Sequence, residues 1–149
     1  MRRTSFADMN CSVAQTLEIV GEWWTLLILR DAFLGVRRFD EFQERLGIAR
    51  NVLTDRLDTL VEQEVLERRP YQDRPPRDEY ILTRKGRDLL PVIHALREWG
   101  DRWVFGRDRA PLRIVHERCG HRTRAVTTCS HCGEELRPGE TRAVPGPGA

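Results

Sequence analysis

The sequence has no apolar run near the roughly 20 residues that a membrane-spanning helix needs. Its most apolar stretch, residues 26–29, lies between a tryptophan and an arginine. The opening Met-Arg-Arg resembles a twin-arginine leader, but polar residues interrupt the apolar segment that should follow. We therefore expect a cytoplasmic protein with no membrane partner.

The motifs of common enzyme classes are missing as well. There is no Ser/His/Asp set, no Gly-rich phosphate loop and no metal motif that leaves a coordination position open for water. His94 lies inside an expected helix, where a solvated or packed side chain explains it better than catalysis. A thiol or zinc enzyme is the least supported interpretation, and we expect a protein that is not an enzyme.

Lysine is nearly absent, since the basic residues are 24 arginines and the single Lys85. The net charge of +2 is too small to indicate nucleic-acid binding by itself. GC-rich codon usage explains the preference for arginine but not its clustering. Residues 68–87 hold seven basic and three acidic residues, a local excess of four. Arginine stays charged and forks onto phosphate or guanine, so this cluster favours a polyanionic partner.

The composition suits one main domain with a small appendage. The chain has 149 residues, 40% of them hydrophobic and 32% charged. We expect a main domain over residues 1–106 and a linker with a compact Cys/His extension over 107–136. Residues 137–149, rich in proline and glycine, are expected to be a disordered tail.

Hydrophobic periodicity predicts two helices in the first part of the chain. One begins at Cys11 and ends at Gly21. The second covers residues 22–33 and is closed by Gly35. Because this second helix is apolar around most of its circumference, including Trp23, we expect it to be the central buried helix.

The next segment predicts a helix-turn-helix unit. Residues 39–46 form a short amphipathic pattern, Gly47 breaks it, and a longer helix follows over about residues 49–64. At about 100° per residue, Leu53, Leu57 and Leu60 fall on one face of that helix. This face should turn into the core.

A β-hairpin is expected directly after these helices. Residues 65–69 and 79–83 have the composition of strands, and the proline-rich residues 70–77 predict a long basic loop between them. A hairpin in this place is a wing. One last helix, capped by Thr83, is expected over residues 85–104, and Pro91 either kinks it or marks its true first turn.

Several short motifs follow one another along residues 11–104. They are Cys11-Ser-Val-Ala, Trp24-Thr-Leu-Leu-Ile-Leu-Arg30, Arg38-Phe39, Leu53-Thr-Asp-Arg-Leu57, Pro75-Pro-Arg-Asp-Glu-Tyr80 and Leu82-Thr-Arg-Lys-Gly86. In this order and spacing they resemble a known family, the HxlR-type transcriptional regulators, which are relatives of the MarR winged-helix group. Two departures stand out: Ser12 replaces the usual proline, and Ala49 replaces a common serine cap, which costs about 1 kcal/mol of helix stability.

The resemblance implies a homodimer that binds double-stranded DNA at inverted half-sites. In this family the N-terminal and C-terminal helices build the dimer. Trp99 and Trp103, four residues apart, form a ridge suited to a partner helix. The expected interface residues are Val13, Leu17, Leu96, Trp99 and Trp103.

The expected fold is therefore mainly α with a small β-hairpin wing, a winged helix-turn-helix followed by a short zinc-ribbon-like segment. The expected function is sequence-specific transcriptional regulation, most simply repression. The alternative is a protein-interaction module that kept the fold without DNA binding. In the DNA-binding interpretation the reading residues are Arg50, Asn51 and Thr54, the flanking phosphate contact is Arg56, and the wing contacts are Arg74 and Arg77.

Cys11 stands at the expected start of the first helix. The helix dipole favours a thiolate there, and several relatives in the family sense oxidants or electrophiles through a cysteine at the matching place. Cys11 is therefore a candidate redox switch for an oxidant or small-molecule effector. The alternative is a small buried hydrophobe.

The last part of the chain carries Cys/His pairs with metal-ligand spacing. His116 and Cys119 are separated by two residues, and so are Cys129 and Cys132. Together they predict one structural zinc per chain, with His121 or His131 as the alternative fourth ligand. A disordered reduced tail and a Cys129–Cys132 redox pair remain the alternatives.

Overall fold

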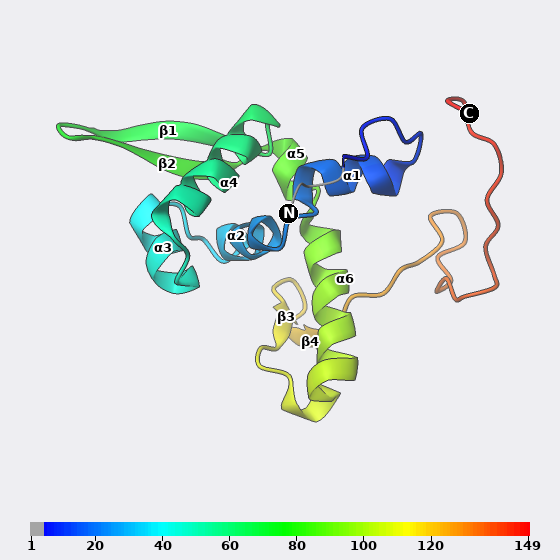
Figure 1. The fold of residues 1–149 in the computed structure, drawn as a ribbon. Helices are drawn as coiled ribbons and strands as arrows, with labels where there is room; N and C mark the ends of the chain where they lie inside the picture. The colour runs from blue at the N-terminus through cyan, green and yellow to red at the C-terminus, as the bar shows by residue number, and fades with distance from the viewer. Residues whose placement is uncertain (1–4) are drawn as a thin grey trace. The chain divides into compact units, whose positions relative to one another are not determined.

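The computed structural model describes residues 5–149. The chain forms two compact units that meet in sequence between Ile93 and His94. No helix among the described residues is long and apolar enough to cross a membrane. The first unit contains α1 (Ser12–Val20), α2 (Trp23–Phe33), α3 (Phe39–Leu46), α4 (Arg50–Glu62), β1 (Leu66–Asp73), β2 (Pro76–Leu82) and α5 (Arg84–Arg87), and α6 (Leu90–Gly100) begins there (Figure 1).

The core of the first unit forms where α2, α3 and α4 meet. Ile28 and Leu29 of α2, Phe42 of α3, and Leu53 and Leu57 of α4 are fully buried. Truncating one such side chain to alanine costs about 2–5 kcal/mol, so these contacts dominate the stability of the unit. This core fixes the orientation of α4.

Helix α2 is only partly the buried helix that its composition predicts. Ile28 and Leu29 are buried as expected, but the Trp23 side chain is 74% exposed. Trp23 is the first residue of α2. An apolar residue therefore remains outside the core at this end of the helix.

A buried carboxylate links α2 to α3. Asp31 is fully buried, and its two oxygens face different arginines. The Arg30 Nη2 atom lies 2.9 Å from Asp31 Oδ1, and the Arg45 Nε atom lies 3.3 Å from Asp31 Oδ2. A buried charge persists only when it is paired, and the Arg45 contact joins α3 to α2, because Arg30 and Asp31 both belong to α2.

The turn between α3 and α4 is short and built on glycine. Gly47 has φ +61°, in the left-handed region that favours glycine. Ile48, which follows it, is only 3% exposed and packs into the core. The two helices therefore form the expected helix-turn-helix unit, with α4 one residue later and two residues shorter than predicted at its ends.

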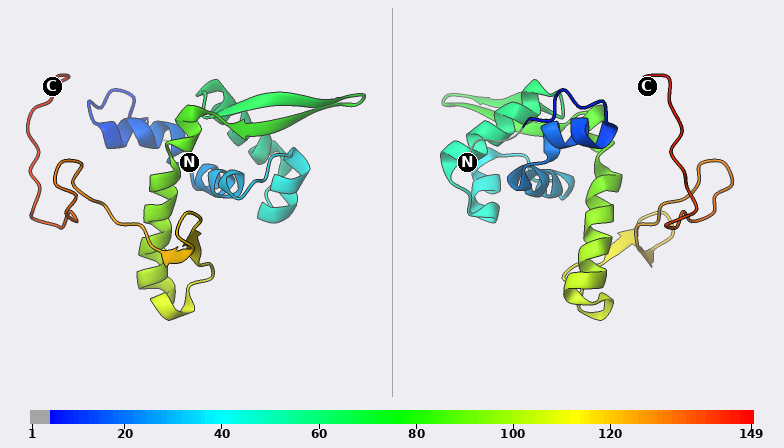
Figure 2. Two further views of the ribbon diagram at one scale, coloured as in Figure 1. Left: turned by 180° about the vertical axis from the view of Figure 1, so that it is seen from behind. Right: turned by 45° about the vertical axis from the view of Figure 1, so that its right-hand side comes forward.

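The wing is a two-stranded antiparallel hairpin that projects past α3 and α4 (Figures 1 and 2). The prediction of a loop over residues 70–77 was wrong, because β1 continues through Pro70 to Asp73 and β2 begins at Pro76. In a two-stranded hairpin one side of each strand is free of ladder hydrogen bonds, so proline is tolerated there. The register also shifts just after Pro70, as at a bulge.

The expected helix over residues 85–104 is divided. Thr83 caps α5 as predicted, because its Oγ1 accepts a hydrogen bond from the Gly86 N–H at 3.0 Å. Helix α6 begins only at Leu90, and Pro91 lies in its first turn. Proline lacks the N–H that would bond to the carbonyl of residue 87, and its ring would clash with that carbonyl. The break therefore falls where the proline requires it.

The second unit begins within α6 and has little packed interior. Its further elements are the π-helical turn η1 (Asp101–Phe105), the 3₁₀ turn η2 (Arg107–Arg109) and the hairpin of β3 (Ile114–His116) and β4 (His121–Thr123). The Glu98 carboxylate lies 2.9 Å from Arg107 and 3.9 Å from Arg124. None of residues 94–149, all of which the structure describes, is buried.

Candidate nucleic-acid interface

Helix α4 turns its leucine face inward. Leu53, Leu57 and Leu60 are fully buried. At about 100° per residue, the residues at the start of the opposite face must then point outward. Arg50, Asn51 and Thr54 are exposed accordingly. The structure therefore brings the three predicted reading residues together on one open surface.

The first turn of α4 has no side-chain cap, because Ala49 is the N-cap residue. The backbone N–H groups at a helix start are suited to an anion, and here no serine or aspartate oxygen occupies them. The Arg50 guanidinium lies over the Phe39 ring, 4.8 Å from its centre. The Thr54 hydroxyl donates a hydrogen bond to the Arg50 carbonyl at 2.9 Å. Both polar side chains are thus held near the first turn.

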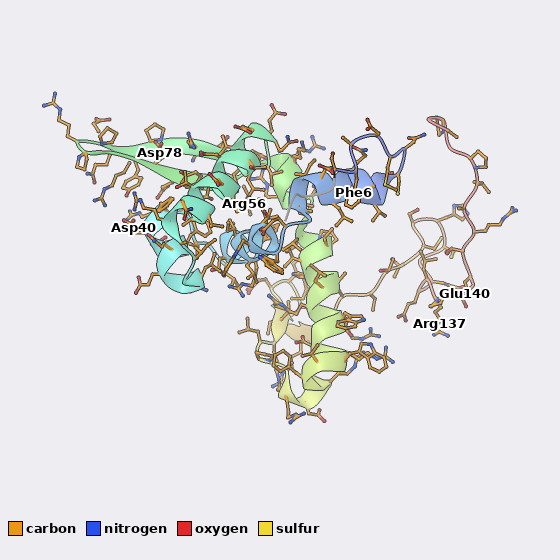
Figure 3. All side chains as sticks on the ribbon, in the orientation of Figure 1. Phe6, Asp40, Arg56, Asp78, Arg137 and Glu140 are labelled. Carbon is orange, nitrogen blue, oxygen red and sulfur yellow. The ribbon has the colours of Figure 1, made fainter. Side chains whose placement is uncertain are left out.

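Arg56 differs from the other predicted contacts. It is half-buried on the flank of α4, and its Nε atom is buried without a hydrogen-bond partner in the described part of the chain (Figure 3). Sequence reasoning placed Arg56 on the flank for phosphate contact. Only its terminal nitrogens remain suited to that role.

The arginines of the wing are of two kinds, those in ion pairs and those without one. Arg68 forms an ion pair with Asp58 of α4, and Arg69 lies 2.8 Å from Glu67. Arg74 and Arg77, near the tip, are exposed and form no ion pair among residues 5–149. The predicted wing contacts are therefore arginines that could bind a phosphate without first breaking an ion pair to a carboxylate.

A cleft joins the start of α4 to the wing. It is lined by Arg38, Arg50, Tyr71 and Arg77, together with Phe39 and prolines of the hairpin. The Arg38 guanidinium lies 4.6 Å from the centre of the Tyr71 ring. Two carboxylates that also line this cleft, Asp40 of α3 and Asp78 of β2, are labelled in Figure 3.

Arg38 and Tyr71 were not among the predicted DNA contacts. Arg38 belongs to a motif that the sequence shows, but its position beside the wing depends on a long-range pairing. Arg38 forms an isolated β-bridge with Glu79 of the wing. The Tyr80 N–H also donates a hydrogen bond to the carbonyl of Arg37, the residue before Arg38, at 2.8 Å. Only the folded hairpin brings these residues to the cleft.

The fold and this surface agree with a protein-family model described as HxlR-like helix-turn-helix, which matches residues 19–108. The chain belongs to the HxlR-like helix-turn-helix family. The matched region contains α2, α3, α4 and the whole wing. The family resemblance seen in the sequence is therefore confirmed.

Known relatives of this HxlR-like chain are named as regulators. It is 46% identical over 137 residues to Rv3095 of Mycobacterium tuberculosis, an HTH-type transcriptional regulator, with 92% of this chain and 87% of the relative covered. The crystal structure of PA1607, named as a candidate transcription factor, matches with a TM-score of 0.85 and 38% identity over 95% of this chain and 99% of that one. The redox regulator HypR, in its oxidized form, matches with a TM-score of 0.57 and 34% identity over 61% of this chain and 95% of that one.

The HxlR-like chain is thus a transcriptional regulator of the helix-turn-helix type. Its relatives are named as regulators and not as enzymes, which supports the non-enzymatic interpretation.

Cys11 is the N-cap residue of α1, and its side chain is exposed. In the single chain Cys11 is therefore not a buried hydrophobe. As the N-cap residue it stands at the start of α1, and its side chain makes no capping hydrogen bond within the described part of the chain.

The residues expected in the dimer interface of this HxlR-like regulator are all exposed in the single chain. A second chain could cover these side chains only if they are exposed in the single chain, and all five are. They are Val13 at 68%, Leu17 at 42%, Leu96 at 52%, and Trp99 and Trp103 at 64% each.

The predicted metal ligands occur as two separate pairs. The His116 Nδ1 atom lies 3.3 Å from Cys119 Sγ. Hydrogen bonds from the backbone N–H groups of Cys132 and His131 lower the pKa of the Cys129 thiol. No group of three or more His, Cys, Asp or Glu side chains that could hold a metal ion is found in residues 5–149. The structure thus forms each half of the predicted set without joining them.

Proposed function

We propose that this chain is a sequence-specific DNA-binding regulator that binds inverted half-sites as a homodimer and represses transcription. The start of α4 would enter the major groove, and the wing would hold the neighbouring backbone. The observation that carries the proposal is the orientation of α4, with Leu53 and Leu57 buried and Arg50, Asn51 and Thr54 exposed. An operator that overlaps a promoter would make such binding repressive.

The chemistry of Arg50 and Asn51 suits direct base reading. Arginine pairs bidentately with guanine and asparagine with adenine, at about 1–3 kcal/mol of discrimination each. Arg50 must leave the face of Phe39 to do so. An exposed cation–π contact is worth about 0.5–1 kcal/mol, which is less than a good bidentate pair. The stacking therefore positions Arg50 without preventing it from reaching a base.

The wing arginines suit phosphate contact. Arg74 and Arg77 are exposed and form no ion pair in the described part of the chain, whereas Arg68 and Arg69 are already paired. Contacts to phosphate supply affinity that falls with salt and is nearly independent of sequence.

A mobility-shift titration against the chain's own promoter fragment tests the proposal. We expect Arg50→Ala and Asn51→Ala to weaken operator binding about tenfold to a hundredfold while leaving binding to unrelated DNA nearly unchanged. Arg77→Ala should weaken both and lower the salt slope by about 1. Arg142→Ala, an exposed arginine far from α4 in sequence, is the matched control. If the chain shifts no DNA, the protein-interaction alternative is favoured.

The exposed apolar residues support the homodimer. Trp99 and Trp103 lie four residues apart and are each 64% exposed, which is unusual for a ridge that faces only water. We expect sedimentation to show a dimer, and Trp99→Ala with Trp103→Ala to weaken it and to weaken operator binding. A wild-type monomer that binds a two-half-site operator with full affinity would contradict this.

We further propose that Cys11 makes DNA binding responsive to oxidants. Its thiol is exposed at a helix start, and the similar protein HypR is described as a redox regulator. Attack of the Cys11 thiolate on hydrogen peroxide gives sulfenic acid and hydroxide, a two-electron oxidation of sulfur. Footprinting with and without peroxide should show a change in wild type that Cys11→Ser abolishes. An equal change in both proteins would contradict the switch.

A further inference from the structure

The second unit contains two hairpin turns with the same local geometry. In each, a potential metal ligand is followed three residues later by a cysteine and then by glycine. The Gly120 N–H donates to the His116 carbonyl at 2.7 Å, and the Gly133 N–H donates to the Cys129 carbonyl at 2.8 Å. The two glycines have φ +70° and +78°, so both turns need the left-handed conformation that glycine supplies.

The backbone that flanks the two turns also corresponds. His116, the last residue of β3, pairs with His121, the first residue of β4. In the second turn the Cys129 N–H donates to the Glu134 carbonyl at 2.8 Å, again between residues five apart. An isolated bridge joins Thr128 and Glu135, as the next pair along a ladder would. Both turns therefore end short antiparallel ladders with the ligand pair at the tip.

Each tip already presents its two ligands together. His116 Nδ1 and Cys119 Sγ are 3.3 Å apart, which is within the separation of two ligands on one tetrahedral ion. The backbone N–H groups of His131 and Cys132 point toward the Cys129 sulfur. Hydrogen bonds to the ligating atoms and their neighbours are the supporting contacts that metal sites use.

The segment that holds these turns has no apolar core to stabilise it. None of residues 94–149 is buried, and beyond α6 they form only two short helical turns and two three-residue strands. So small a segment needs a staple in place of a core, and a structural metal is the staple that its cysteines allow.

We propose that the two turns close on one zinc ion within the same chain, held by His116, Cys119, Cys129 and Cys132. Three thiolates and one imidazole make a tetrahedral structural site with no position left for water. The connection between Cys119 and Cys129 is short, so closure within one chain costs little loop entropy and gives each turn a high effective concentration of the other. Fully extended, this connection spans about 33 Å, so its length does not prevent closure.

Elemental analysis of the full-length reduced protein, combined with Co²⁺ substitution, tests the site. We expect one zinc ion per chain, and a Co²⁺ form with thiolate-to-cobalt charge-transfer absorption. Cys119→Ser and Cys132→Ser should each lose the metal or bind it much more weakly. Cys11→Ser, His121→Ala and His131→Ala should keep one metal ion, because these residues lie outside the proposed set.

Three results would overturn the site. Wild-type protein could be folded and metal-free with all four thiols reduced, it could hold a Cys129–Cys132 disulfide in place of metal, or Cys119→Ser could bind Co²⁺ as wild type does. A variant whose chain misfolds as a whole is recognised by loss of operator binding, because the proposed DNA contacts of α4 lie in the first unit and the expected dimer residues lie in both units. Loss of metal with operator binding retained supports the proposal.

A mixing experiment decides whether the site lies within one chain. One variant carries His116→Ala with Cys119→Ser, and the other carries Cys129→Ser with Cys132→Ser. Each retains one intact turn. When the two are unfolded and refolded together, a site within one chain predicts no recovery of tight Co²⁺ binding. Recovery would show that two chains share the ion and would overturn this arrangement.

Discussion

The buried Asp31 provides the sharpest test of how the helix-turn-helix is held together. Its carboxylate is fully buried, whereas the partner side chains are partly exposed, Arg30 to 38% and Arg45 to 49%. When one arginine is removed, the other still pairs with Asp31. The pair that is lost was partly screened by water and so contributed little. We therefore expect Arg30→Ala and Arg45→Ala each to lower the free energy of unfolding by about 1 kcal/mol.

Removing both arginines should cost much more than the two single losses together. Asp31 is then a buried charge without a counter-ion, and breaking such a pair costs about 3–5 kcal/mol. The assay is urea unfolding of the single and double variants at one fixed protein concentration, since dimerisation adds to apparent stability. Arg37→Ala, an exposed arginine just before α3, is the control.

Two outcomes would refute this reasoning. One is a double variant that loses no more than the sum of the single variants, within about 0.5 kcal/mol. The other is a failed rescue. Adding Asp31→Asn to the double variant removes the uncompensated charge and should restore part of the lost stability. If stability is not restored, the loss comes from the packing of the arginine side chains and not from the charge.

Three further predictions concern backbone and titration. Gly86→Ala should destabilise the protein strongly, because the new Cβ would lie 2.1 Å from a backbone carbonyl oxygen. Gly100, which is in a helix, has open space around it, so Gly100→Ala should stabilise the protein by about 0.5–1 kcal/mol. Equal effects of the two variants in thermal melts would contradict this. Thr83→Ala should cost about 1 kcal/mol in urea unfolding through loss of the α5 cap, and Thr83→Ser should keep most of it. Burial, and then the Arg97 guanidinium, lower the pKa of His94, so the folded state binds its proton less readily than the unfolded state. Stability should therefore fall as the pH drops below the ordinary value of 6.5, and His94→Gln should flatten that fall in melts recorded across pH 5–8; an unchanged profile would contradict the assignment.

The elements that the sequence predicted well are those set by local periodicity. Residues 39–46 form α3 with the predicted bounds, and the leucine row of α4 faces the core. The exposure of Arg50, Asn51 and Thr54 follows directly, because a buried face determines the exposed one in a regular helix. Thr83 also caps a helix as predicted, since capping depends on only a few neighbouring residues.

The features that sequence reasoning missed depend on tertiary contacts. The continuation of β1 through Pro70 depends on the partner strand, and the burial of Asp31 depends on Arg45 from another helix. The pairing of Arg38 with the wing is equally long-range. Spacing predicted the ligand pairs near the C-terminus, because each lies within one turn, but it does not predict how two turns approach each other.

The exposed indole rings give the protein a built-in optical signal. Trp23, Trp99 and Trp103 are mostly exposed, so their emission in a separated chain should be that of indole in water. If Trp99 and Trp103 meet a second chain, water leaves their rings and the emission shifts to shorter wavelength. Simple dilution in a fluorimeter would then follow dissociation of the two subunits without an added label.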